Sequence, residues 1–247
     1  MNLRKVLSAL TLVCAMGFAT AARAASDVIR VATDATFPPL EFVQNGKRTG
    51  FDIELIEAMA KLMNKQVQWV DIDFKGLIPG LLANRFDVAA SGIYMTDERR
   101  KVVAFTDSYY QGGLAILVKK DNKTINQPED LAGKKVSVQV GTKSVNFLKE
   151  TFPTVQRVEV EKNQEMFDLL TIGRVDAVVT GRPAAAQFAK TQPSVRLLDK
   201  GLTVEHYGYA LRKDDAALLE QMNKALQQLR ANGTYNTLVT RWFTASN

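Results

Sequence analysis

Residues 91–101 of the chain are SGIYMTDERRK, which has the pattern of a strand end, a glycine turn and the start of a helix. Thr96 is a suitable N-cap residue, and the acids at 97 and 98 suit the positive end of a helix dipole. Arg99 does not, because the same dipole opposes a cation in the first turn. A guanidinium placed there is expected to face an anion beside the exposed backbone N–H groups. A solvated face of a basic helix is the alternative that this segment leaves open.

The segments on either side alternate between strand and helix patterns. Upstream, strands are predicted at 28–32, 67–72 and 86–90, and helices at 50–63 and 77–83. Downstream, strands are predicted at 113–118, 135–140, 155–160, 176–180 and 207–211, and helices at 144–151, 164–172, 216–231 and 235–243. This order predicts an α/β protein of two βαβ lobes, with the last helices returning to the first lobe.

Ligands of such sheets bind outside the carboxyl ends of the strands, at turns into helices. Asp34, Gly92, Gly141 and Gly181 all follow predicted strands. We therefore expect these four positions to lie around a shared site.

The first 24 residues have the pattern of an export signal. Arg4 and Lys5 precede an apolar run from Val6 to Thr20, and Ala22-Arg23-Ala24 is an A-x-A cleavage site. The run is short for a membrane anchor. We expect a soluble periplasmic protein that begins near residue 25. It would lack disulfides, because the only cysteine lies within the signal.

Composition excludes several classes of function. Three of the 32 Lys and Arg residues and none of the 26 Asp and Glu residues lie in the signal, so the remaining chain has a net charge of about +3. There is no basic patch with aromatic residues to bind nucleic acid. The single histidine and the absence of metal-ligand spacing favour no cofactor and no metal.

Several motifs together carry a resemblance to a known family. They are ATDATFPPLEF at 32–42, GFDI at 50–53, DFKGLIP at 73–79, TDER at 96–99, DSYY at 107–110, DLAGK at 130–134 and NGTY at 232–235. In this order they resemble the periplasmic polar amino-acid-binding proteins of ABC importers, with the glutamine binders as the nearest group. The resemblance covers nearly the whole chain after the signal.

The resemblance implies the type II periplasmic binding fold, with two lobes joined by two hinge strands. The hinges would lie near 109–113 and 205–209, and the lobes would comprise 25–110 with 208–247, and 111–207. The ligand would be enclosed by hinge closure, and the closed form, a monomer, would deliver it to a permease in the inner membrane.

The resemblance also implies roles for single residues. Arg99 would bind the ligand carboxylate bidentately, with Thr142 offering its N–H and hydroxyl. Phe37 and Phe74 would enclose the body of the ligand, and Asp34 would face its distal end. The full predicted binding set is Asp34, Phe37, Phe74, Ser91, Gly92, Tyr94, Arg99, Gln139, Thr142, Thr180 and Gly181.

Two positions depart from the family pattern. Family members that bind α-amino acids carry a Thr or Ser and an Asp that bind the α-ammonium, and here these positions are Tyr94 and Gly181. A buried ammonium without an anion is costly. One hypothesis is a carboxylate ligand without a free α-ammonium, or with its amine against Asp34 or Glu41, and with Arg182 meeting a second anion. The other is an ordinary amino acid whose ammonium binds a different residue.

An enzyme is the alternative function, because periplasmic cyclohexadienyl dehydratases resemble this family. Such an enzyme needs a proton donor aimed at the leaving group. Glu41 and Asp34 are the only cleft acids that the sequence suggests, so we expect a binding protein and not an enzyme. A sensory partner of a receptor is a third possibility that the sequence does not separate from transport.

Overall fold

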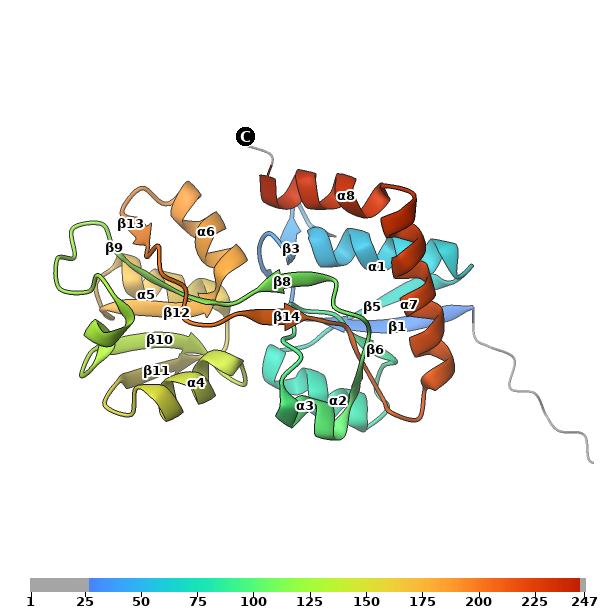
Figure 1. Cartoon of the computed structure of the whole chain (residues 1–247), viewed down its shortest axis with the longest axis horizontal. Coiled ribbons are helices and arrows are strands. Elements are labelled where there is room, and N and C mark those ends of the chain that lie inside the picture. Colours follow the sequence, from blue (N-terminus) through green and yellow to red (C-terminus); the bar gives the residue numbers. More distant parts are fainter. Residues whose placement is uncertain (1–26, 245–247) are drawn as a thin grey trace, which may run out of the picture.

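A computed structural model gives the fold of the chain, and it describes residues 27–244 (Figure 1). The predicted export signal lies outside the described residues. Within this range, none of the helices combines the length and apolar character needed to cross a bilayer.

The first lobe is built on a five-stranded sheet of order β5-β1-β6-β15-β7. Its strands are β1 (Val28–Thr33), β5 (Gln66–Asp71), β6 (Val88–Ala89), β7 (Ala104–Phe105) and β15 (Ala210–Leu211). Strand β1 runs parallel to β5 and β6, whereas β15 runs antiparallel to β6 and β7. Its helices are α1 (Phe51–Leu62), α2 (Leu77–Leu82), α3 (Asp97–Val102), α7 (Ala216–Ala231) and α8 (Thr234–Val239).

Helix α1 shows why the sequence folds locally as it does. Its apolar residues at 51, 55, 56, 59 and 60 are buried, which is one face of a helix turned to the core. The helix begins after Gly50, whose φ is 123°, and a Cβ there would lie 2.3 Å from the carbonyl oxygen of Leu40. Only glycine fits this contact with the hairpin that precedes the helix.

That hairpin belongs to a small sheet of β2 (Thr36–Phe37), β3 (Glu41–Gln44) and β4 (Lys47–Thr49). Strand β2 pairs with β3, so that Phe37 lies opposite Glu41. The sheet therefore places two residues of the cleft side by side.

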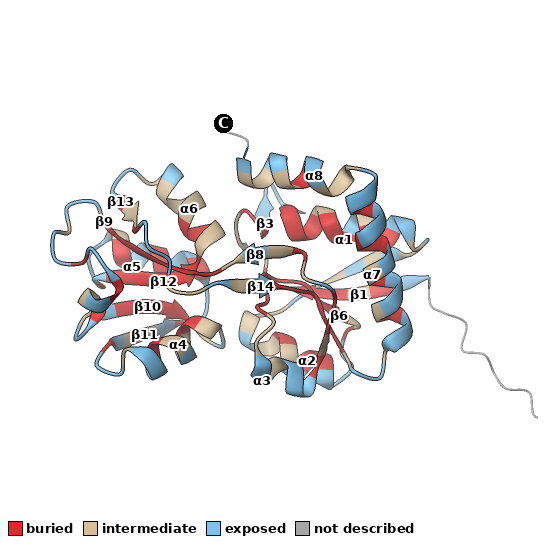
Figure 2. Ribbon diagram, in the orientation of Figure 1, coloured by how far each residue is buried: buried red, intermediate tan, exposed pale blue. Residues whose placement is uncertain are grey.

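The second lobe is built on a sheet of order β11-β10-β12-β9-β13. Its strands are β9 (Leu114–Lys119), β10 (Lys135–Gln139), β11 (Gln156–Val160), β12 (Ala177–Gly181) and β13 (Val195–Leu197), and its helices are α4 (Lys143–Thr151), α5 (Asn163–Thr171) and α6 (Arg182–Thr191). All five residues of the central strand β12 are buried. Figure 2 shows buried residues along the sheets of both lobes and exposed residues on the outer turns of the helices.

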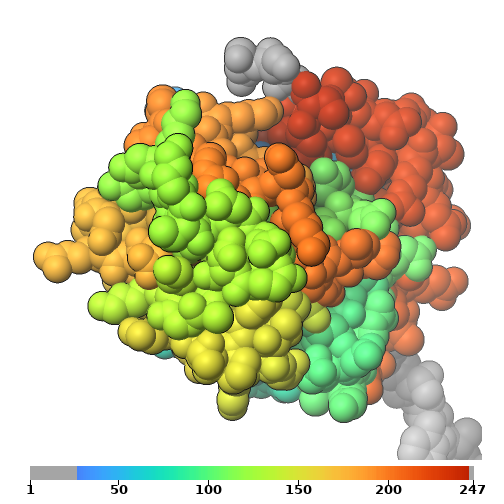
Figure 3. Space-filling model, turned by 60° about the vertical axis from the view of Figure 1, so that its left-hand side comes forward, coloured from blue at the N-terminus to red at the C-terminus, as the bar shows by residue number. Residues whose placement is uncertain are grey.

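Two antiparallel strands cross between the lobes, β8 (Tyr110–Gly112) and β14 (Glu205–Tyr207). They lie where the hinge strands were predicted, and the predicted fold of two α/β lobes is confirmed. We propose lobe boundaries within this ladder, after residues 110 and 207. On the face drawn in Figure 3 the two lobes abut.

The structure differs from the sequence prediction at several places. The strand predicted at 207–211 is divided between β14 and β15, and the helix predicted at 235–243 is α8 followed by a wider turn at Thr240–Thr244. Helix α6 and strand β13 were not predicted. Only Ala184 and Ala185 of helix α6 are fully buried, and Phe188, stacked on Phe167, is its one large apolar residue, so the helix lacks the repeated large apolar residues that mark a helical period.

Candidate functional site

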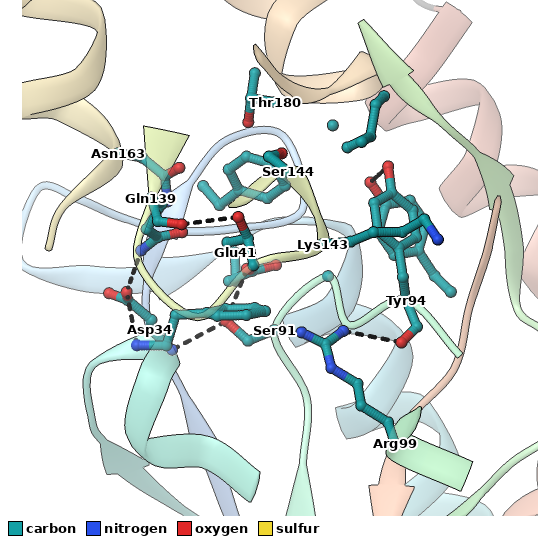
Figure 4. A pocket seen from close by; sticks show the side chains of 17 residues that line it. Asp34, Glu41, Ser91, Tyr94, Arg99, Gln139, Lys143, Ser144, Asn163 and Thr180 are labelled. Carbon is teal, nitrogen blue, oxygen red and sulfur yellow. Dashed lines mark hydrogen bonds between the residues drawn. The ribbon is translucent and has the colours of Figure 1, made fainter. Parts of the chain in front are cut away.

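A cavity lies between the lobes, where the carboxyl ends of strands from both sheets face each other (Figure 4). All eleven predicted binding residues line it. The cavity is small, with a volume of about 30 Å³. For comparison, a single buried water needs a cavity of roughly 10–15 Å³. The other lining residues are Glu41, Leu114, Lys143, Ser144, Asn163 and Tyr207.

Arg99 lies at the wall of this cavity, in the first turns of α3. The Thr96 hydroxyl caps the helix by accepting the N–H of Arg99 at 3.3 Å. The guanidinium donates from Nη1 to the carbonyl oxygen of Tyr94 at 2.9 Å and from Nη2 to that of Gly141 at 3.1 Å. It also lies 5.5 Å from the centre of the Phe74 ring. Gly141 belongs to the second lobe, so Arg99 contacts both lobes.

The charge of Arg99 has no carboxylate partner. Burial lowers the pKa of Arg99 to about 10, which leaves the group charged at neutral pH. No carboxylate oxygen of the described chain lies within 4.0 Å of a guanidinium nitrogen of Arg99. Two of the five N–H groups of a guanidinium are used, and the others are available to an anion.

Two buried carboxyl groups lie beside the glycine turn, and one of them, Glu41, lines the cavity. Asp52 of α1 accepts the N–H of Gly92 at 3.0 Å and the hydroxyl of Tyr109 at 2.7 Å through the same oxygen. Glu41 accepts the hydroxyl of Ser91 at 2.9 Å. The other oxygen of each carboxyl, Oδ1 of Asp52 and Oε2 of Glu41, has no hydrogen-bond partner in the described part of the chain.

Burial favours the protonated form of both acids. It raises the pKa of Asp52 to about 7, against the lowering effect of the Gly92 N–H and the Tyr109 hydroxyl. Burial, together with the charges of Asp52 and Asp34, raises the pKa of Glu41 well above 4.5, although the Ser91 hydroxyl lowers it. Glu41, the one of the two that lines the cavity, is therefore biased to its neutral form.

These shifts predict a pH dependence of stability. Between the usual pKa of 3.8 and the folded value of about 7, the folded protein keeps a proton at Asp52 that the unfolded chain has released. The contribution of Asp52 to the free energy of unfolding thus falls as pH rises through this window. We expect Asp52→Asn to flatten this decline, because Asn does not titrate; its amide oxygen can still accept the two hydrogen bonds from Gly92 and Tyr109.

Urea denaturation of both proteins at about pH 4, 5.5 and 7 measures the effect. The exposed carboxyl of Asp121 supplies the control Asp121→Asn. Equal slopes for the wild type and Asp52→Asn would show that Asp52 does not titrate in this range.

Asp34 is saturated by protein groups. Its Oδ1 accepts the Thr36 hydroxyl at 3.1 Å and the Lys162 ammonium at 3.2 Å. Its Oδ2 accepts the Phe74 N–H at 3.2 Å and the Gln139 amide at 2.9 Å. Lys162 was not predicted as a site residue; it follows β11 by two residues and lies on the other lobe.

The two departures from the family pattern lie together. Tyr94 and Tyr207 stack with ring centres 4.3 Å apart, and the Tyr207 hydroxyl donates to that of Tyr94 at 2.8 Å. The Tyr94 hydroxyl donates in turn to the Gly113 carbonyl at 2.8 Å. A Cβ at Gly181 would lie 2.6 Å from the Tyr207 hydroxyl. Two tyrosines thus fill the space beside Gly181, and no carboxylate faces the cavity there among the described residues.

Other predicted residues have different contacts from those expected. The Thr142 hydroxyl donates to the Gln139 carbonyl at 2.7 Å, so its proton is already used. Arg182 does not line the cavity: its Nη1 donates to the Asp199 carbonyl at 3.2 Å on the surface, and the expectation that it meets a ligand anion there is wrong. Lys143 lines the cavity and pairs with Glu205 at 3.2 Å.

A family model and the relatives found by sequence comparison agree on the family of this chain. The model of the bacterial extracellular solute-binding proteins, family 3, matches residues 29–245. The ABC transporter arginine-binding protein 1 of Escherichia coli (strain K12) is 33% identical over 225 residues, which cover 89% of this chain and 92% of the relative.

Two solved structures share the fold. An ancestral arginine-binding protein bound to arginine has a TM-score of 0.85 and 41% identity, covering 88% of this chain and 98% of that one. An ancestral amino acid-binding protein, a precursor of cyclohexadienyl dehydratase, has a TM-score of 0.84 and 42% identity, covering 88% and 96%.

Proposed function

The chain belongs to the bacterial extracellular solute-binding proteins, family 3, and we propose that it is the periplasmic binding component of an ABC transporter. It captures an amino acid or related small carboxylate between its lobes and delivers it to a permease in the inner membrane. Residues 1–24 would direct its export, and it would act as a monomer. The two crossing strands, β8 and β14, supply the hinge for closure.

The observation that carries this proposal is the charged guanidinium of Arg99 at the boundary between the lobes. It faces a closed cavity, contacts a carbonyl of each lobe and has no carboxylate partner in residues 27–244. A ligand carboxylate would supply the missing charge and accept two parallel hydrogen bonds. Binding would then favour the closed arrangement of the lobes.

The ligand we propose is a compact carboxylate whose amine, if present, does not bind beside Tyr94 and Gly181. The stacked tyrosines leave an ammonium there without an anion, and Glu41 is biased to its neutral form. Arginine and histidine are named as ligands of relatives, but in the described part of this chain no carboxylate faces the cavity beside Tyr94 and Gly181, where an α-ammonium would need one.

Isothermal titration against matched pairs tests this ligand class. Each pair is an L-amino acid and the same acid without its α-amino group, such as phenylalanine and 3-phenylpropanoate, or leucine and 4-methylpentanoate. We expect the deaminated member to bind at least as tightly. Binding of an ordinary amino acid at a low-micromolar or lower Kd, well below that of its deaminated partner, would contradict the proposal.

In this account Phe74 packs against the ligand, and its loss is expected to raise the Kd less than the loss of Arg99. Phe74→Ala removes an aromatic wall of the cavity and the ring beside the guanidinium. We expect the Kd of the tightest carboxylate in the panel to rise by roughly tenfold. Phe74→Leu, which keeps an apolar wall, should lose less affinity, and an unchanged Kd for Phe74→Ala would place the ligand away from this ring.

A second candidate function is a dehydratase on the same fold. Its support is Glu41, a buried acid that lines the cavity and whose pKa burial raises, as a general acid requires. Incubation with prephenate or arogenate, followed by absorbance of the aromatic product, tests it. Turnover that Glu41→Gln abolishes would establish the enzyme; binding without turnover supports the transport protein.

A further inference from the structure

The carboxylate of Asp34 has all of its hydrogen-bonding capacity filled by the protein. Each of its oxygens accepts two donors, at distances from 2.9 to 3.2 Å, and a carboxylate offers about four such positions. Its side chain is 2% exposed. We name these groups the Asp34 cluster: Asp34, the Thr36 hydroxyl, the Phe74 N–H, the Gln139 amide and the Lys162 ammonium.

The Asp34 cluster joins the two lobes. Asp34 follows β1 of the first lobe, whereas Gln139 ends β10 and Lys162 precedes α5 of the second. Lys162 also pairs with Asp73 at 2.6 Å, on the first lobe. Its ammonium therefore lies between two carboxylates of the opposite lobe whenever the lobes are closed as they are here.

Lys162 is protonated and positively charged at neutral pH. Burial lowers its pKa, but the hydrogen bond to Asp73 and the charge of Asp34 outweigh burial and raise it overall. The half-exposed Lys162 ammonium thus pairs with Asp34 from outside the cavity lining and shares its charge with Asp73. Of the other acids and bases that line the cavity, Glu41 is biased to its neutral form by burial, Lys143 is paired with Glu205, and Arg99 is a cation.

From these contacts we infer that Lys162 determines specificity, as a counter-ion built into the protein that excludes ligands with a cationic distal end. A ligand cation that approached Asp34 would meet the ammonium of Lys162 and four filled acceptor positions. It would either stay unpaired in a closed cavity or displace Lys162 and open the boundary between the lobes. A ligand with a neutral distal end would neither leave a charge unpaired in the cavity nor displace Lys162.

The inference rests on the proposed function, because it requires a carboxylate ligand oriented by Arg99. It goes further by stating which distal group the cavity rejects. This distinguishes the chain from its arginine-binding relative, whose ligand ends in a guanidinium.

The test compares ligands that differ only in the distal charge. The pairs are L-arginine with L-citrulline, and 4-guanidinobutanoate with 4-ureidobutanoate, so that one pair carries an α-amino group and the other does not. Isothermal titration at low ionic strength gives the ratio of Kd values within each pair. For the wild type we expect the neutral member to bind at least about tenfold more tightly.

Lys162→Met removes the charge and retains most of the side-chain volume. We expect it to reduce the preference for the neutral ligand by about tenfold or more. Lys149→Met is the control, because Lys149 is an exposed lysine of the same lobe, on α4. It should leave the ratio within about twofold. A wild type that prefers the cationic member, or a Lys162→Met variant with an unchanged ratio, overturns the inference.

A measurement without ligand separates this inference from the proposed function. Small-angle X-ray scattering of the ligand-free proteins should give a larger radius of gyration for Lys162→Met than for the wild type and Lys149→Met. Equal radii would contradict the role of Lys162 at the lobe boundary, whatever the panel shows. If no carboxylate of either pair binds to any of the proteins, the carboxylate site at Arg99 fails, and the scattering result alone decides about Lys162.

Discussion

Arg99→Ala is expected to raise the Kd of the tightest-binding carboxylate of the panel by about a thousandfold or more. The substitution removes two parallel, charge-assisted hydrogen bonds that Arg99 would donate to a ligand carboxylate in the cavity between the lobes. It also removes the donor to the Gly141 carbonyl, which joins the lobes in the closed form. The fold itself should change little, because the side chain makes no ion pair within the described structure and caps no element.

Two further variants test whether the loss of affinity is specific to the guanidinium of Arg99. Arg99→Lys keeps the charge and loses the planar pair of donors, so its affinity should lie between those of the wild type and Arg99→Ala. Arg100→Ala removes the adjacent, exposed arginine, which donates only to the Met95 carbonyl and lies over the Phe105 ring. It should bind normally. An Arg99→Ala protein that binds within about tenfold of the wild type would show that the carboxylate is bound elsewhere.

Gly181→Ala is expected to weaken binding by roughly tenfold to a hundredfold with little loss of stability. Glycine at this position allows the second lobe to approach the stacked tyrosines. A Cβ would lie 2.6 Å from the Tyr207 hydroxyl and 3.1 Å from the Phe37 ring. Tyr207 is fully buried and hydrogen-bonded to Tyr94, so it has little room to move, and the lobes would close less completely.

Gly201→Ala is the matched control on the same lobe, because a Cβ there meets no atom closer than 3.7 Å. Isothermal titration and thermal unfolding of both variants separate closure from folding. We expect Gly201→Ala to resemble the wild type in both measurements. A Gly181→Ala protein with unchanged affinity would show that the tyrosine pair adapts, and that this contact does not limit closure.

Local patterns in the sequence were sufficient to predict most of the helices and strands of the fold. Helix α7 was predicted over the residues that form it, because its apolar positions recur at the helical period and Asn232-Gly233 ends it. Helix α6 was missed because its inner face carries alanines and a single large apolar residue, Phe188, which make no helical repeat. The proline after Arg182 was the one local signal of its start, since proline is favoured in the first turn of a helix.

The positions around the cavity were predictable, but their contacts were not. Glycine turns and strand ends place residues at the carboxyl edges of the sheets, and all eleven predicted residues line the cavity. Tyr207 and Lys162 were not recognised as partners, because the first lies 113 residues from Tyr94 and the second 128 residues from Asp34. Such pairs depend on how the two lobes meet, which no local pattern determines.

A crystal structure of the protein with the carboxylate that copurifies with it, or with the tightest acid of the panel, tests the central claim most directly. The account predicts the carboxylate oxygens about 2.7–3.1 Å from two guanidinium nitrogens of Arg99, between Phe37 and Phe74. A structure in which Arg99 turns to bulk water, and another group binds the acid end of the ligand, would contradict it.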